Sequence, residues 1–366
     1  MKLTIIAGAR PNFMKIAPLI KAIKKAQSGN KHISYRLVHT GQHYDKNMSD
    51  SFFEELNIPA PDANLGIGGG TQAEQTAGIM IAFEKELMEN PTDLVVVVGD
   101  VTSTMACSIV AKKLNTKVAH IEAGIRSWDI TMPEEINRIV TDALSDYYFT
   151  TTEIANENLR KYGAKEEQIF FVGNVMIDTL FDNMSRFRKP GIFDKLSLAE
   201  KQYIMLTLHR PANVDEAEKL KLLMDEIVNN VEGLPIIFPI HPRTAKIFTD
   251  LGINARNLHI VEPMGYLEFN YMVQRSKCVI TDSGGITEET TVMGIPCITL
   301  RDNTERPETI TIGTNELIGT NPEAIKPTLE KLFLGQWKKG GIPELWDGKS
   351  AERIVEELLT HLLIRQ

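Results

Sequence analysis

Short runs of apolar, mostly β-branched residues recur along the chain, and they end in glycine, aspartate, histidine or arginine. Longer segments between them carry apolar residues at helical spacing. Parallel strands that are buried on both faces have continuous apolar sequences, and crossover helices connect them. The pattern therefore predicts an α/β fold built from parallel sheets.

The runs that qualify as strands fall into two groups of six. They lie at 3–9, 35–41, 94–100, 118–124, 147–152 and 169–175, and then at 203–210, 235–241, 258–263, 278–285, 296–302 and 316–320. Two groups of equal size predict two Rossmann-like doubly wound sheets. A chain of 366 residues fits this prediction, because single hydrophobic cores stop growing at roughly 250–300 residues.

The alternation of strands and helices is interrupted at residues 184–202, directly after the sixth strand. We therefore place the domain boundary near residue 175. We expect an N-terminal domain over 1–175, a C-terminal domain over 176–349 and a last helix over 350–366. That helix has a broad apolar stripe, so we expect it to pack back on the first domain.

Helix starts can also be predicted. Thr71 and Glu74 have the spacing of a capping box, and Pro11 and Pro133 each stand where a first helical turn would begin.

Composition excludes several classes of protein. The formal net charge of −8 argues against a general nucleic-acid binder, which needs a basic surface. Cys107, Cys278 and Cys297 are odd in number and widely spaced, which indicates buried thiols and neither a disulfide framework nor a zinc site. The first apolar run is too short for a signal peptide, and no run approaches the length of a membrane span. We expect a cytoplasmic protein without membrane contact.

Polar residues cluster at the ends of the predicted strands. Ligands of open parallel sheets bind beyond the carboxyl ends of the strands, and two domains that face each other across a cleft would line it with both sets of strand ends. The residues at these ends are Arg10, Gln42, Asp100, Glu122, His209, Arg210, His241, Asp282 to Gly285, and Arg301.

The first domain contributes two carboxylates to this set. Glu122 interrupts an apolar strand, so its carboxylate needs a partner, and Arg126 or Arg138 is the expected one. Asp100 closes another apolar run and has a structural alternative as the N-cap of the following helix.

Three further carboxylates follow Glu122 in the stretch HIEAGIRSWDITMPEEINR (120–138). Glu134 and Glu135 stand in the first turn of a helix, where the helix dipole favours negative charge regardless of function. We expect Glu135 to be only such a charge and Asp129 to be a solvated loop residue. Glu134 stays a candidate for chemistry together with Glu122.

The second domain contributes histidines and an anion-binding turn. His209 and His241 end adjacent strands, which favours a shared site over two unrelated histidines. The turn Ser283, Gly284 and Gly285 lies between a strand and a helix, where backbone N–H groups and the helix dipole favour a phosphate. A tight turn without a ligand is the alternative.

Basic residues near these strand ends could neutralise a diphosphate: Arg10, Lys15, Arg301 and Arg306. The first strand turn, GARPNF, lacks G-x-G-x-x-G, and GIGGGT (66–71) follows no convincing buried strand. There is also no Walker lysine motif, zinc-spaced histidine pair or serine elbow. We therefore expect neither a nucleotide redox cofactor nor a metal.

Six motifs together resemble the non-hydrolysing UDP-N-acetylglucosamine 2-epimerases over nearly the whole chain. They are GARPNFMKIAPLI, HIEAG, PEEINR, GNVMIDTL, TDSGGITEE and RPE. The resemblance implies a two-domain glycosyltransferase-B architecture, a homodimer, and interconversion of UDP-N-acetylglucosamine and UDP-N-acetylmannosamine without a cofactor, in the supply of cell-surface polysaccharide precursors.

The resemblance also implies roles for single residues. It assigns catalysis to Asp100, Glu122, Glu134 and His209. It assigns binding of the UDP part to Arg10, Lys15, His241, Met264, Phe269, Ser283, Gly284, Gly285, Glu289 and Arg306. The implied route eliminates UDP to form 2-acetamidoglucal and adds UDP back after reprotonation of C2 on the opposite face, which requires acid/base groups and an anion cradle.

Some positions depart from the commonest pattern of the family. Thr287 stands where Gln is usual, RPANV follows His209, and Met132 precedes PEE. These departures raise the alternative of a modified UDP-N-acetylhexosamine, such as a 3-acetamido or uronic acid derivative. Gly69 and Gly70 replace residues of members that are regulated by a second sugar nucleotide. A hydrolysing 2-epimerase, a glycosyltransferase of the same architecture and a non-catalytic UDP-sugar sensor are the remaining alternatives.

Overall fold

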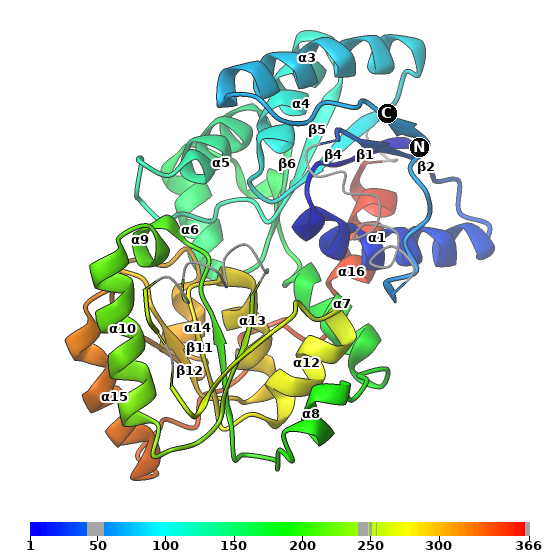
Figure 1. The fold of residues 1–366 in the computed structure, drawn as a ribbon. Coiled ribbons are helices and arrows are strands. Elements are labelled where there is room, and N and C mark those ends of the chain that lie inside the picture. The colour runs from blue at the N-terminus through cyan, green and yellow to red at the C-terminus, as the bar shows by residue number, and fades with distance from the viewer. Residues whose placement is uncertain (42–54, 241–247, 249–250, 254, 363–366) are drawn as a thin grey trace. The chain divides into compact units, whose positions relative to one another are not determined.

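The computed structural model describes residues 1–41, 55–240, 248, 251–253 and 255–362 (Figure 1). The chain divides into two compact units. The N-terminal unit comprises Met1–Asp182 and Glu344–Gln366, and the C-terminal unit comprises Asn183–Pro343.

Each unit contains one parallel sheet. The strands of the N-terminal unit have the order β3-β2-β1-β4-β5-β6-β7, and those of the C-terminal unit the order β10-β9-β8-β11-β12-β13. All pairs in both sheets are parallel. The predicted α/β class with two doubly wound sheets is confirmed.

The strands of the N-terminal unit are β1 (Lys2–Ala7), β2 (Ser34–His39), β3 (Ala63–Asn64), β4 (Leu94–Val98), β5 (Lys117–Ile121), β6 (Tyr147–Thr150) and β7 (Ile169–Phe171). Those of the C-terminal unit are β8 (Ile204–Thr207), β9 (Ile236–Pro239), β10 (Leu258–Val261), β11 (Cys278–Thr281), β12 (Cys297–Thr299) and β13 (Asn315–Leu317). Every predicted strand is present, and only β3 was not predicted, because two edge residues leave no apolar run.

The helices of the N-terminal unit are α1 (Arg10–Ser28), α3 (Gln72–Glu89), α4 (Thr102–Lys113), α5 (Pro133–Leu144), α6 (Glu153–Lys161), η1 (Glu166–Gln168), α16 (Ser350–Glu357) and η3 (Leu358–Leu362), and α7 (Val175–Met184) runs across the boundary between the units. Those of the C-terminal unit are α8 (Gly191–Lys195), α9 (Pro211–Val214), α10 (Ala217–Asn230), α12 (Tyr266–Arg275), α13 (Gly284–Met293), α14 (Pro307–Thr311), η2 (Pro322–Ala324) and α15 (Ile325–Phe333).

Several local predictions are confirmed. Thr71 and Glu74 form the capping box of α3, and Pro11 and Pro133 stand in the first turns of α1 and α5. The three cysteines are buried free thiols. None of the described helices has the length and apolar composition that crossing a bilayer requires.

The division between the units falls after Asp182 instead of near residue 175, because the start of α7 is bound to the N-terminal unit. Thr179 Oγ1 donates to the Met14 carbonyl at 2.5 Å. The Asp178 carboxylate accepts from the backbone N–H groups of Ser350 at 3.1 Å and Ala351 at 2.7 Å, at the start of α16. Helix α16 packs on α1 (Figure 1).

The strand order reverses once in each sheet, between β1 and β4 and between β8 and β11. Ligands of doubly wound sheets bind outside the carboxyl ends of the strands at such a reversal. Asp100 follows β4, and His209 and Asp282 follow β8 and β11. The topology thus places candidate residues at both reversals.

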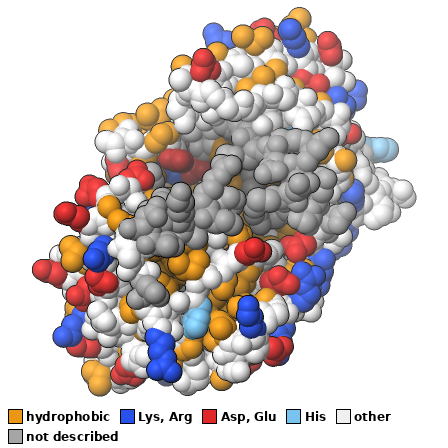
Figure 2. Space-filling view, in the orientation of Figure 1, with side chains coloured by type: hydrophobic (Ala, Val, Ile, Leu, Met, Phe, Trp, Pro, Cys, Tyr) orange, Lys and Arg blue, Asp and Glu red, His pale blue; other side chains and the backbone are white. Residues whose placement is uncertain are grey.

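The surface charges are mixed. On the described part of the face drawn in Figure 2, Lys and Arg side chains lie among Asp and Glu side chains. They form no continuous basic stripe there. Binding to a phosphate backbone requires such a stripe.

Candidate active site

Glu122 lies directly after β5 in an unusual backbone conformation. Its φ of +69° is left-handed, which is rare for a residue other than glycine. Its N–H donates to the Phe149 carbonyl on β6 at 2.9 Å. The side chain is 3% exposed and forms an ion pair with Lys15, whose Nζ lies 2.6 Å from Glu122 Oε2. Strain of this kind concentrates at functional sites.

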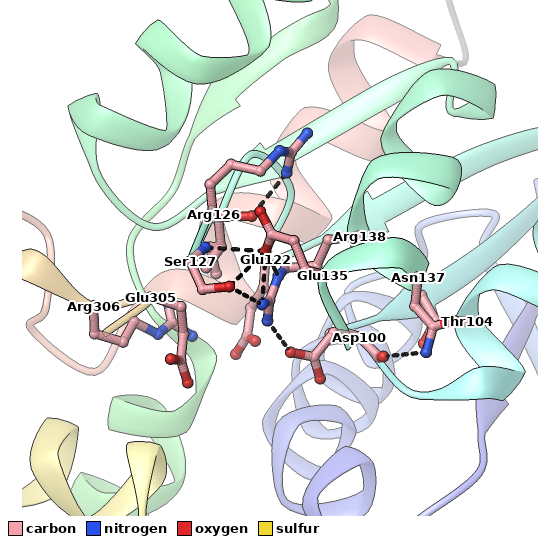
Figure 3. Close-up of polar contacts among 12 residues, drawn as sticks. Asp100, Thr104, Glu122, Arg126, Ser127, Glu135, Asn137, Arg138, Glu305 and Arg306 are labelled. Atoms are coloured by element: carbon pink, nitrogen blue, oxygen red, sulfur yellow. Dashed lines mark hydrogen bonds and ion pairs between the residues drawn. The ribbon is translucent and has the colours of Figure 1, made fainter. Parts of the chain in front are cut away.

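The expected partners of Glu122 were wrong. Arg126 pairs instead with Asp142 at 2.6 Å. Arg138 pairs with Asp100 and with Glu135, whose Oε2 lies 2.8 Å from Arg138 Nη2 (Figure 3). Each arginine thus has another carboxylate as its counterion, and the cation for Glu122 comes from α1.

Asp100 does not cap the following helix. The N-cap of α4 is Val101, and no side chain accepts a hydrogen bond there. The Asp100 carboxylate is 31% exposed and contacts Arg138, and the Asp100 carbonyl accepts from Asn137 Nδ2 at 2.8 Å. Residues of α5 thus contact both the carboxylate and the backbone carbonyl of Asp100. The carboxylate therefore has a fixed position and is still accessible to solvent.

The adjacent residues Glu134 and Glu135 differ sharply in their surroundings. Glu134 is exposed in the first turn of α5, whereas Glu135 is 1% exposed. Glu135 accepts hydrogen bonds from the N–H groups of Ser127 at 3.0 Å and Trp128 at 3.1 Å and from Arg138 Nε at 2.9 Å. The interpretation of Glu135 as a mere helix-start charge was therefore wrong: it holds the preceding loop.

The same loop contains Asp129, which is half-buried and not fully solvated. Its carboxylate accepts from the Thr131 N–H at 3.0 Å. This local turn explains why Asp129 is not fully solvated.

The C-terminal unit places His209 over a buried aspartate. Asp282 is fully buried, whereas the His209 side chain is 61% exposed, and His209 Nδ1 lies 2.7 Å from Asp282 Oδ1. Asp282 also accepts from the N–H groups of His209 at 3.0 Å and Arg210 at 2.9 Å and from Asn213 Nδ2 at 3.1 Å. Burial alone would raise the pKa of Asp282, but its contact with His209 and these hydrogen bonds hold it below its ordinary value.

The Ser-Gly-Gly turn opens helix α13 as predicted. Ser283 is the N-cap, and its side chain makes no cap hydrogen bond to the first turn. A Cβ atom on Gly284 would lie 2.8 Å from Glu305 Oε1, so a larger residue there would require the Glu305 side chain to move. Arg301 pairs with Glu305 at 2.5 Å. Arg306 is buried and pairs with Glu288 of α13.

Glu289 is buried one residue further along α13. It accepts from Tyr266 Oη at 2.7 Å and from Asn270 Nδ2 at 3.4 Å, both on α12. Burial raises the pKa of Glu289 to about 7. Met264 and Phe269 are half-buried and pack against the apolar cluster of the same unit.

Some predicted residues contribute less to the described geometry. His241 lies outside the described residues, and only the backbone of Arg10, the first residue of α1, is described. Thr287 is 3% exposed, and its hydroxyl donates to the Gly284 carbonyl at 2.5 Å. That hydroxyl closes the first turn of α13, so local structure accounts for Thr287.

Sequence reasoning missed two pairings. Lys15 was expected only at the UDP part. Its contact joins it to Glu122, more than one hundred residues away, and no local sequence pattern indicates such a contact. Asp282 belonged to the set of strand ends, but its place beneath His209 was not predicted. The sequence did indicate that β8 and β11 could be parallel neighbours, and adjacent parallel strands bring the residues at their ends together.

Within the described residues, no group of three or more His, Cys, Asp or Glu side chains could hold a metal ion.

Comparisons with known proteins agree with this geometry. A family model described as UDP-N-acetylglucosamine 2-epimerase matches residues 25–359. The chain is 44% identical to the UDP-N-acetylglucosamine 2-epimerase of Methanocaldococcus jannaschii, over 98% of this chain and 99% of that protein. It is 39% identical to the UDP-2,3-diacetamido-2,3-dideoxy-D-glucuronate 2-epimerase of Pseudomonas aeruginosa, over 98% and 99% of the two chains.

Solved structures are similar as well. The Methanocaldococcus jannaschii enzyme in complex with UDP-GlcNAc and UDP has a TM-score of 0.87 at 43% identity, with 98% of this chain and 99% of that chain covered. The Neisseria meningitidis enzyme bound to UDP-GlcNAc has a TM-score of 0.88 at 30% identity, with 99% and 100% covered.

Proposed function

The chain belongs to the UDP-N-acetylglucosamine 2-epimerase family, and from this premise we propose that it interconverts UDP-N-acetylglucosamine and UDP-N-acetylmannosamine without a redox cofactor. The observation that carries the proposal is the arrangement of Glu122, Asp100 and Glu134 in the N-terminal unit. One lies after β5, one after β4 and one in the first turn of α5, and Arg138 links α5 to Asp100.

The reaction removes the proton from C2 and breaks the bond from C1 to the UDP oxygen, which leaves 2-acetamidoglucal and UDP. Addition of UDP to C1 and of a proton to the opposite face of C2 completes the inversion. Both half-reactions need proton acceptors and donors, and Glu122, Asp100 and Glu134 supply them. Lys15 holds the Glu122 carboxylate in place through an ion pair.

The departing diphosphate needs positive partners. In the C-terminal unit, the backbone N–H groups of Gly284 and Gly285 in the first turn of α13 and the guanidinium of Arg306 supply them. His209 presents Nε2, because its Nδ1 faces Asp282. Within the C-terminal unit, Glu289, Met264 and Phe269 shape the nucleotide pocket, and the sequence resemblance assigns Arg10 and His241 to binding of the UDP part.

Deuterated water tests this proposal. The protein is incubated with UDP-N-acetylglucosamine, and the products are resolved by NMR. Intact UDP-N-acetylmannosamine with deuterium at C2 is expected. Free N-acetylmannosamine with UDP would support the hydrolysing alternative, and unlabelled C2 with every UDP-N-acetylhexosamine would contradict the proposal.

A modified sugar is the second candidate substrate, because one relative at 39% identity is a UDP-2,3-diacetamido-2,3-dideoxy-D-glucuronate 2-epimerase. Parallel assays with both sugar nucleotides decide by kcat/KM. A higher value for the diacetamido glucuronate would reassign the substrate within the same mechanism.

The neighbouring residues Glu134 and Glu135 provide a matched pair of variants. Glu134→Gln should lower kcat by roughly a hundredfold or more and lower the free energy of unfolding by at most about 1 kcal/mol, because Glu134 is exposed and only its interaction with the helix dipole is lost. Glu135→Gln should lower that free energy by about 1.5–3 kcal/mol, because its buried carboxylate binds Arg138 and two N–H groups. If Glu134→Gln changed only stability and Glu135→Gln changed only kcat, Glu135 would be the residue with the chemical role and Glu134 the structural one.

We also extend the proposal to a cytoplasmic homodimer that supplies precursors of cell-surface polysaccharides, as the sequence resemblance implies. Light scattering coupled to gel filtration measures the oligomeric state. A monomer at micromolar concentration would contradict the proposed homodimer.

A further inference from the structure

A fully buried histidine lies two residues before Glu122. His120 stands in β5, an inner strand of the sheet, and Asp142 lies in α5. The ring has a partner on each side: Nδ1 lies 2.7 Å from Asp142 Oδ1, and Nε2 lies 2.8 Å from the Gly99 carbonyl oxygen. The His120 ring is 0% exposed and Asp142 is 4% exposed. Neither ring nitrogen can reach substrate.

The chemistry of the partners sets the direction of both hydrogen bonds. A carbonyl oxygen only accepts, so Nε2 donates to Gly99. Burial alone would raise the pKa of Asp142, but His120 and Arg126 hold it below its ordinary value, and the ionised carboxylate accepts from Nδ1. The other oxygen of Asp142 pairs with Arg126 at 2.6 Å and accepts from the Gly124 N–H at 3.1 Å. These polar groups form one connected buried network.

The network ends on two glycines that flank the candidate carboxylates. Gly99 directly precedes Asp100, and Gly124 follows Glu122 after one residue. The φ angles of Gly99, Glu122 and Gly124 are +69°, +69° and +78°, all left-handed. Glycine adopts this conformation without strain, but at Glu122 it is strained and persists only where its surroundings hold it. His120 donates to the Gly99 carbonyl, and Asp142 accepts from the Gly124 N–H. These two hydrogen bonds hold the glycines next to Asp100 and close to Glu122.

Both glycines also lie close to neighbouring groups, and Gly124 has no room for a side chain. A Cβ atom on Gly124 would lie 2.3 Å from the Ala155 carbonyl oxygen. A Cβ atom on Gly99 would lie 3.0 Å from Lys15 Nζ and 3.7 Å from Glu122 Oε2. The turn that carries Asp100 therefore lies against the ion pair of Glu122, and a shift of this turn changes the position of one carboxylate relative to the other.

We propose that His120 is a positioning residue, whose hydrogen bond to the Gly99 carbonyl ties the Gly99–Asp100 turn to β5, the strand that Glu122 follows, and so fixes the spacing of the two carboxylates. The inference rests on the proposed function, because the spacing matters only if both carboxylates serve C2. Displacement of a reacting group by about 1 Å can cost roughly a hundredfold in rate.

Two substitutions separate the two hydrogen bonds of the ring. In His120→Gln the amide nitrogen reaches the place of Nε2 and keeps the bond to Gly99. In His120→Asn the amide nitrogen reaches only the place of Nδ1, so the bond to Gly99 is lost and the contact with Asp142 remains. Each variant loses one buried hydrogen bond, so both should unfold at similar temperatures.

Three measurements test the inference: kcat and KM for UDP-N-acetylglucosamine, the melting temperature, and hydrogen–deuterium exchange of the segments 97–104 and 119–127. His120→Asn should lower kcat by roughly a hundredfold at an unchanged KM, and both segments should exchange faster. His120→Gln should keep kcat within about tenfold of the parent and keep the exchange slow. Trp346→Phe serves as a control, because it removes a buried donor from the Thr151 carbonyl of the same unit and should leave kcat unchanged.

A merely structural histidine predicts another pattern. Equal kcat values for the Gln and Asn variants at equal melting temperatures, or a change confined to KM, would overturn the inference. Failure of the proposed function is seen separately, because the parent protein would then incorporate no deuterium at C2. The exchange measurement decides the link between the two turns even in that case, and equal exchange in both variants would refute it.

Discussion

Two histidine–aspartate pairs, one in each unit, share the same contact and differ in the surroundings of the ring. In both pairs His Nδ1 lies 2.7 Å from a buried aspartate oxygen. The His120 ring is fully buried and bound at both nitrogens, whereas the His209 side chain is 61% exposed. The same two residue types thus form an internal link in one unit and present an imidazole to the surface in the other.

Their places in the sheets account for the difference. His120 lies inside β5, a strand with neighbours on both sides, and its ring meets the turn after β4. His209 comes after the end of β8, beyond the last paired residue of the strand. A histidine inside a central strand can bind only protein, but one beyond a strand end can also bind a ligand.

The largest expected effect separates the two histidines by catalysis. His209→Asn keeps a donor near the place of Nδ1 for Asp282 and removes Nε2. We expect kcat to fall by roughly a hundredfold or more, with little change in the free energy of unfolding. Steady-state kinetics and urea unfolding measure the two quantities. An active His209→Asn variant would show that the exposed pair has no part in the chemistry.

The aspartate beneath His209 should have a smaller effect on rate and a clear effect on stability. Asp282→Asn places an amide where the carboxylate accepts from two backbone N–H groups and Asn213. We expect the free energy of unfolding to fall by about 1.5–3 kcal/mol and kcat to fall by roughly tenfold, because the imidazole loses its fixed orientation. The pH profile of kcat should shift as well, and a profile identical to that of the parent would limit Asp282 to a structural role.

Much of this arrangement could be predicted from the sequence. Apolar runs locate the strands, and the rule that ligands bind at strand ends selects Asp100, Glu122 and His209 from the residue pattern alone. The turn at Ser283–Gly285 is similarly visible, because adjacent glycines between a strand and a helix are typical of an anion-binding turn.

The pairing of charges could not be predicted. Glu122 was expected to pair with an arginine close in sequence, but its partner Lys15 comes from α1. Glu134 and Glu135 are identical in type and adjacent, and only the helical rotation of about 100° per residue decides which one is buried. Sequence patterns record burial along one element, whereas ion pairs depend on how several elements meet.

Glu289 sharpens the comparison, because it is a buried carboxylate whose hydrogen-bond partners, Tyr266 and Asn270, are neutral. Histidine holds the pKa of Asp142 and Asp282 below the ordinary value despite burial, whereas burial raises the pKa of Glu289 from 4.5 to about 7. The pKa shifts therefore have opposite signs, and so do their effects on how stability depends on pH. The two aspartates stabilise the fold above pH 3.8, and this contribution is lost as the pH falls. Stability from Glu289 is greatest below pH 4.5 and declines as the pH rises to about 7.

Glu289→Gln should remove this decline, since glutamine keeps an oxygen that accepts from Tyr266 and cannot ionise. Relative to the parent, the variant should gain free energy of unfolding between about pH 5 and pH 8, on the order of 1–3 kcal/mol. Urea unfolding at several pH values measures the difference. Glu330→Gln on α15 is the matched control, because Glu330 is exposed, and its difference from the parent should not vary with pH. A Glu289→Gln difference that shrinks as the pH rises would mean that a cation stabilises the Glu289 carboxylate, as histidine does in the two aspartate pairs.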